Sequence, residues 1–123
     1  MALKTDLTEE QARKLFKGLV HYGYLGPRTP VENFLSIMGI GEYPFHTVNW
    51  IGTGMNSLVY CVKRICGHKN SDLLKRMCDC FTVNGQPLNH GTLKTKSSYV
   101  DRNVDKFDFV PLMDKIIASA KKK

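Results

Sequence analysis

Residues 55–88 read MNSLVYCVKRICGHKNSDLLKRMCDCFTVNGQPL, and the first three quarters of this stretch carry two helical patterns. Apolar residues recur at helical spacing over 55–66, and Gly67 ends that pattern. Ser71 is a suitable N-cap for a second helix, which runs to about Cys80. The two helices are therefore expected to be joined by a short glycine-containing turn.

The end of the same stretch has the pattern of a β-hairpin. Asn84 and Gly85 lie between two short runs of strand-forming residues, and Asn-Gly is the strongest local indication of a tight hairpin turn. Pro87 restricts the second strand to an edge of any sheet, because proline cannot donate a ladder hydrogen bond. The order helix, turn, helix, hairpin predicts an arrangement similar to a winged helix-turn-helix.

The flanking sequence predicts three further helices, over about 8–22, 30–38 and 109–120. The first begins with a capping box, in which the side chains of Thr8 and Gln11 can each accept a hydrogen bond from the other residue's backbone N–H. The second begins with Thr29 as its N-cap and Pro30 in its first helical position. All three have an apolar stripe at helical spacing.

The sequence as a whole predicts a single mainly α domain over residues 1–123, with about five helices and a small β-hairpin. Residues 89–106 are polar and basic, and we expect them to form a loop with a short strand at about 93–96. The basic end, residues 119–123, is expected to be frayed.

The sequence shows neither a secretory signal nor a membrane span. Acidic residues occupy the N-terminal positions at which a signal peptide needs an apolar segment. No stretch approaches the roughly 18 apolar residues of a membrane-spanning helix. We therefore expect a soluble intracellular protein, cytoplasmic or nuclear, that does not bind membranes.

Positive charge is concentrated in the middle of the chain. Lysine and arginine number 18 against 11 acidic residues, which gives a formal net charge of +7. Residues 1–42 are neutral overall, whereas residues 43–98 contain seven basic and two acidic residues. A surface with this charge attracts polyanions before any specific contact forms.

These basic residues predict a non-enzymatic protein that binds RNA or DNA. Lysine and arginine can neutralise phosphates, and asparagine and arginine can read base edges. No catalytic or cofactor motif is present in the sequence. The predicted nucleic-acid-binding residues lie on the two central helices, their turn and the segment after the hairpin: Lys63, Arg64, Lys69, Asn70, Ser71, Lys75, Arg76, Lys94 and Lys96.

The aromatic residues of segment 40–54 favour an alternative function. This segment has no helical period, and long irregular segments in small domains are usually functional or covered by a partner. Tyr43, Phe45 and Trp50 could bind a protein partner or stack on bases. In this alternative the protein is a structural subunit of a larger assembly, such as a viral nucleocapsid, a ribonucleoprotein or another multi-protein complex, or forms a homo-oligomer.

The cysteines raise a second alternative, a zinc-binding module. In a reducing compartment four cysteines are free thiols or metal ligands rather than disulfides. Cys66, His68, Cys78 and Cys80 offer sulfur and nitrogen for one tetrahedral zinc ion. The spacing argues against this site, because residues two apart on a continuous helix point to nearly opposite sides, so Cys78 and Cys80 converge only if the helix ends at about Met77. We therefore predict no cofactor and keep zinc as the alternative.

Overall fold

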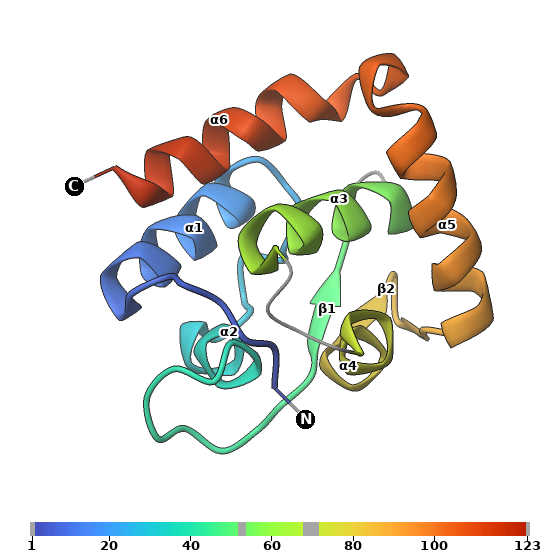
Figure 1. The fold of residues 1–123 in the computed structure, drawn as a ribbon. Helices are drawn as coiled ribbons and strands as arrows, with labels where there is room; N and C mark the ends of the chain where they lie inside the picture. Colours follow the sequence, from blue (N-terminus) through green and yellow to red (C-terminus); the bar gives the residue numbers. More distant parts are fainter. Residues whose placement is uncertain (1, 52–53, 68–71, 123) are drawn as a thin grey trace.

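The computed structural model describes residues 2–51, 54–67 and 72–122 (Figure 1). These residues form six α-helices, one short 3₁₀ helix and a three-stranded sheet. In chain order the elements are α1 (Glu9–His21), α2 (Val31–Ile37), β1 (Val48–Trp50), α3 (Met55–Cys66), α4 (Leu73–Cys80), β2 (Phe81–Val83), β3 (Gln86–Pro87), α5 (His90–Arg102), η1 (Val104–Lys106) and α6 (Phe109–Lys121). The predicted mainly α fold is confirmed. No helix within the described ranges is long and apolar enough to cross a membrane.

Helix α3 lies at the centre of the fold and is the most buried helix. It packs against α5 and α6, and α6 in turn packs along α1. Figure 1 shows α6 running across the top of the view, with α1 to the left of α3 and α5 to its right. Eight residues of α3 are buried, from Ser57 to Cys66, so this helix meets protein on most of its circumference. Burial of apolar side chains around α3 is therefore the main force that holds the helices together.

The capping box of α1 is confirmed. The Gln11 N–H donates to Thr8 Oγ1 at 3.1 Å, and the Thr8 N–H donates to Gln11 Oε1 at 3.0 Å. Helix α2 differs slightly from its prediction, since Pro30 rather than Thr29 is the N-cap and the helix begins at Val31. Pro30 has extended backbone dihedral angles, which a proline adopts readily at this position.

The predicted hairpin is confirmed, and it belongs to a larger sheet. Strands β2 and β3 are antiparallel, and Asn84 and Gly85 both have positive φ, of 50° and 81°. A two-residue turn of this kind needs two left-handed residues, which asparagine and glycine tolerate better than others. Strand β2 also pairs in parallel with β1, so that Val48 lies opposite Phe81.

Strand β1 was not predicted, because its pairing is non-local. It is three residues long, and its partner β2 follows only after α3 and α4. The Asn49 side chain fixes the register: its Oδ1 accepts hydrogen bonds from Thr82 Oγ1 at 2.7 Å and from the Gly85 N–H at 2.8 Å. Segment 40–54 is therefore only partly irregular.

The prediction of a loop with a strand at 93–96 is wrong. Residues 90–102 form helix α5, capped by Asn89, whose Oδ1 accepts from the Thr92 N–H at 3.1 Å. Only Leu93 and Val100 of this helix are buried. The two buried residues are seven positions apart on an otherwise polar helix. So few apolar positions do not allow a helical period to be recognised in the sequence.

The winged helix-turn-helix arrangement stays a prediction. Residues 68–71, which include the turn and Ser71, lie outside the described residues. The described part of α4 has Asp72 as its N-cap, and α4 packs mainly against α5. Helix α3 packs mainly against α5 and α6. The two helices thus share α5 as a neighbour.

The sequence predicts a frayed tail over residues 119–123, and the structure describes residues 119–121 as the last turn of α6. Helix α6 continues to Lys121, and the last carbonyl groups accept hydrogen bonds from α1. The helix is held there by its packing on α1, which the sequence of the tail alone does not reveal.

Candidate nucleic-acid interface

The two basic residues predicted on α3 have acidic partners within the protein. Lys63 Nζ donates to both carboxylate oxygens of Asp101, at 2.9 and 2.8 Å, and to Ser97 Oγ at 2.7 Å. Arg64 Nε lies 3.5 Å from Asp114 Oδ1, which also accepts from the Tyr60 hydroxyl. A phosphate would have to compete with these carboxylates, so Lys63 and Arg64 contribute little free positive charge.

The α4 part of the predicted face has one free lysine. Lys75 is exposed and has no ion-pair partner among the described residues. Arg76 is half-buried, and its Nη1 donates to the Ala2 carbonyl at 2.7 Å. Arg76 therefore ties the N-terminal segment to α4. Lys69, Asn70 and Ser71, the other predicted contacts of this part, lie outside the described residues.

Lys94 and Lys96, predicted on the segment after the hairpin, lie on helix α5. Lys94 is exposed and Lys96 half-buried, and neither forms an ion pair within the described ranges. Among the described residues of the predicted face, three cations on two helices thus form no ion pair. We call these, Lys75, Lys94 and Lys96, the α4–α5 lysines.

The structure assembles a second basic surface where α1 and α6 lie side by side (Figure 1). Gln11 contacts Lys121 at one end of this seam, and Gly18 contacts Ile116 further along, so the two helices run antiparallel. A Cβ atom at Gly18 would lie only 2.8 Å from Ile116 Cγ2. Glycine at this position therefore allows the close approach of the two helices.

A groove of about 250 Å³ follows this seam. Ile116 and Ala120 are buried and form its floor, and the exposed lysines Lys14, Lys17 and Lys115 form its rims. We call it the α1–α6 groove; its lining residues are Lys14, Lys17, Gly18, Tyr22, Lys115, Ile116, Ser119 and Ala120.

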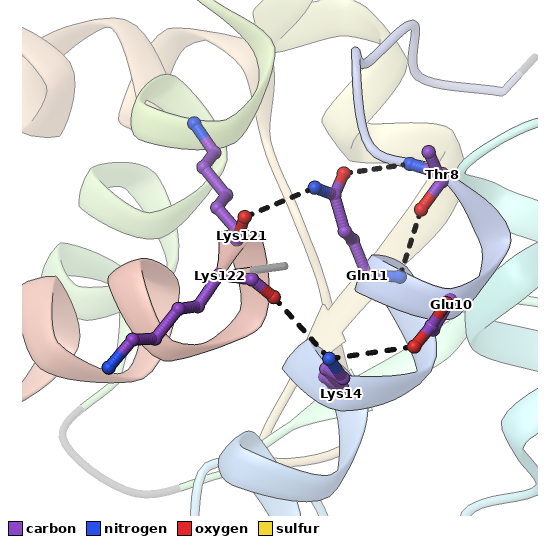
Figure 2. A network of polar contacts seen from close by, with 6 residues as sticks. All are labelled: Thr8, Glu10, Gln11, Lys14, Lys121 and Lys122. Carbon is purple, nitrogen blue, oxygen red and sulfur yellow. Dashed lines mark hydrogen bonds and ion pairs between the residues drawn. The ribbon is translucent and has the colours of Figure 1, made fainter.

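The C-terminal residues extend the basic surface beyond the groove (Figure 2). Gln11 Nε2 donates to the Lys121 carbonyl at 3.3 Å, and Lys14 Nζ donates to the Lys122 carbonyl at 3.4 Å. These contacts use only the backbone of Lys121 and Lys122. Figure 2 shows the ammonium groups of Lys121 and Lys122 directed away from this network.

Glu10 is the one acidic residue described in this network, and it lies 3.6 Å from Lys14 Nζ. Lys17 and Lys115 are exposed and form no ion pair with any described residue. The surface therefore carries a clear excess of positive charge. Its five cations, the α1–α6 lysines, are Lys14, Lys17, Lys115, Lys121 and Lys122.

Sequence reasoning missed this surface because its two halves are far apart in the chain. Lys14 and Lys122 are 108 residues apart. Each half separately looks like an ordinary solvated helix face or a basic tail. Only the packing of α6 on α1 brings them together.

Trp50 belongs to the core and is unavailable as a surface contact, contrary to its predicted role. It is 1% exposed, and its Nε1 donates to the buried Ser57 Oγ at 3.0 Å. Tyr43 is half-buried, and its hydroxyl accepts from Arg13 Nη2 at 3.2 Å. Phe45, 43% exposed, is the member of this set with most of its ring accessible. The hypothesis of a protein partner at segment 40–54 therefore depends on Phe45 and Tyr43.

The geometry of α4 does not favour a zinc site. The helix continues to Cys80, so Cys78 and Cys80 do not meet the condition for convergence on one metal. No group of three metal-ligating side chains occurs in the described part of the chain, and His68 lies outside it. Cys66 and Cys80 are buried and Cys78 is half-buried.

Thiol labelling is expected to distinguish Cys78 from the other three cysteines. Burial raises the pKa of Cys61 and Cys66 to about 12 and that of Cys80 to about 11. Partial burial also raises the pKa of Cys78, but this thiol is accessible to solvent whereas the other three are buried. Since the thiolate is the nucleophile, an alkylating reagent at pH 8 should modify Cys78 first and the buried thiols only after unfolding. Mass spectrometry of the labelled peptides measures this. Rapid labelling of all four thiols in the folded protein would contradict the structure.

Comparison of the chain with known protein families, with curated proteins and with solved structures found no match.

Proposed function

We propose that the protein binds nucleic acid through the α1–α6 lysines. The observation that carries this proposal is one continuous basic surface: three lysines of α1 and α6 line the groove and two C-terminal lysines extend the surface beyond it, with Glu10 as the acidic neighbour described there. Regularly spaced phosphates are the polyanion that best matches several separate cations along a seam. Neutralising such phosphates releases condensed counterions, which makes binding favourable at low salt.

The side chains at this surface favour binding without base specificity. Lysine contacts phosphate as a point charge, whereas base reading relies on paired donors and acceptors such as those of arginine, asparagine and glutamine. The groove lining contains three lysines, one serine and one tyrosine as its polar side chains. We therefore propose a sequence-tolerant, non-enzymatic RNA- or DNA-binding protein.

A salt titration of the wild-type protein tests this proposal. Binding of a labelled mixed-sequence RNA strand should weaken with salt, with a slope of log affinity against log salt of about −3.5 if all five lysines contact phosphates. Fluorescence anisotropy at several salt concentrations measures the slope. Absence of binding at low salt, or binding that does not respond to salt, would contradict the proposal.

A further inference from the structure

The α1–α6 groove has an apolar floor between basic rims, which suits a ligand with both apolar and anionic parts. Ile116 and Ala120 lie at the floor, and Lys14, Lys17 and Lys115 lie at the rims. The methylene stems of the lysines add further apolar surface. A phosphate alone would gain nothing from such a floor, whereas a nucleotide combines a flat apolar ring with a phosphate.

One aromatic side chain lines the same groove. Tyr22, the C-cap residue of α1, is 43% exposed. The His21 ring meets it edge-on, with ring centroids 4.7 Å apart and an interplanar angle of 89°. His21 can cover at most one face of the Tyr22 ring, so the other face is not occupied by this contact. An exposed aromatic side chain beside lysines is the arrangement by which proteins stack unpaired bases.

We propose that the α1–α6 groove holds an unpaired base of single-stranded nucleic acid, stacked on Tyr22, while the lysines at its rims bind the flanking phosphates. This inference rests on the proposed function and makes it more specific. Bases in a duplex are already stacked on one another, and taking one out costs unstacking and unpairing. The groove therefore gives the protein a preference for single strands over duplexes.

Substitutions of two tyrosines test this inference. Tyr99 on α5 is a matched control, since it is 45% exposed and does not line the groove. Tyr22→Ala should lower the affinity for a mixed-sequence RNA strand of about 12 nucleotides roughly tenfold and leave the affinity for a duplex of equal length unchanged. Tyr22→Phe, which keeps the ring, and Tyr99→Ala should both bind the strand like wild type. Circular dichroism checks that each variant is folded.

Three results would overturn the inference. If Tyr22→Ala binds the strand as tightly as wild type does, the groove holds no base, and the proposed function still stands on its salt dependence. If Tyr99→Ala loses strand binding instead, the stacking site lies on α5. If wild type binds neither strand nor duplex, both proposals fail.

Discussion

Replacing Lys14, Lys17 and Lys115 together by alanine is expected to lower the affinity for RNA about a hundredfold at moderate salt. The triple variant loses three cations at the rims of the α1–α6 groove. The slope of log affinity against log salt should become shallower by about 2, since fewer counterions are released. The folded state should be little affected, because the contacts that Lys14 makes, an ion pair with Glu10 and a hydrogen bond to the Lys122 carbonyl, are both exposed. Anisotropy titrations measure the affinity, and thermal unfolding measures the stability.

The α4–α5 lysines provide a control with the same change in net charge. Replacing Lys75, Lys94 and Lys96 by alanine also removes three positive charges, but from the face that the sequence predicts. This variant should bind RNA within severalfold of wild type, because only the long-range attraction is reduced. Equal losses in the two triple variants would mean that net charge alone governs binding, and a larger loss in the control would return the interface to α4 and α5.

Trp50→Ala is expected to lower the free energy of unfolding by about 3–5 kcal/mol. The Trp50 ring packs against Tyr24 and Phe81, with centroids 5.4 and 6.3 Å away. The substitution leaves a cavity at a residue that is 1% exposed, and it removes the donor that the buried Ser57 hydroxyl accepts from. Urea unfolding followed by circular dichroism measures the change.

Phe45→Ala is the matched control for this prediction, because Phe45 is an aromatic residue of the same segment but is 43% exposed. Its removal should change the free energy of unfolding by no more than about 0.5 kcal/mol. If both variants were equally stable, Trp50 would not be a core residue. Because Trp50→Ala is expected to be destabilised, part of the variant protein is expected to be unfolded. A loss of partner or RNA binding in this variant is therefore a binding effect only where it exceeds the fraction of unfolded protein.

Elements with local chemical determinants could be predicted from the sequence. The capping box of Thr8 and Gln11 and the hairpin turn at Asn84 and Gly85 are each specified by residues no more than three positions apart. Helices α3 and α6 have dense apolar stripes that need no tertiary information to be recognised. These features are confirmed because side chain and backbone interact within the same turn.

Features that depend on distant residues could not be predicted. Strand β1 exists because β2 lies beside it, and α5 is held by two buried residues against α3 and α4. The charge of Lys63 is largely offset by Asp101, which is 38 residues away. The α1–α6 lysines come together only through helix packing. The candidate site was therefore the part of the molecule least accessible to sequence reasoning.

The position of the bound nucleic acid can be measured directly by NMR titration of the isotopically labelled protein with a mixed-sequence RNA strand. The account predicts that backbone and lysine side-chain resonances shift along α1 and α6, around Lys14, Lys17 and Lys115, while those of α4 and α5 change little. Shifts confined to α4 and α5, or no shifts at RNA concentrations that saturate binding in the anisotropy assay, would contradict it.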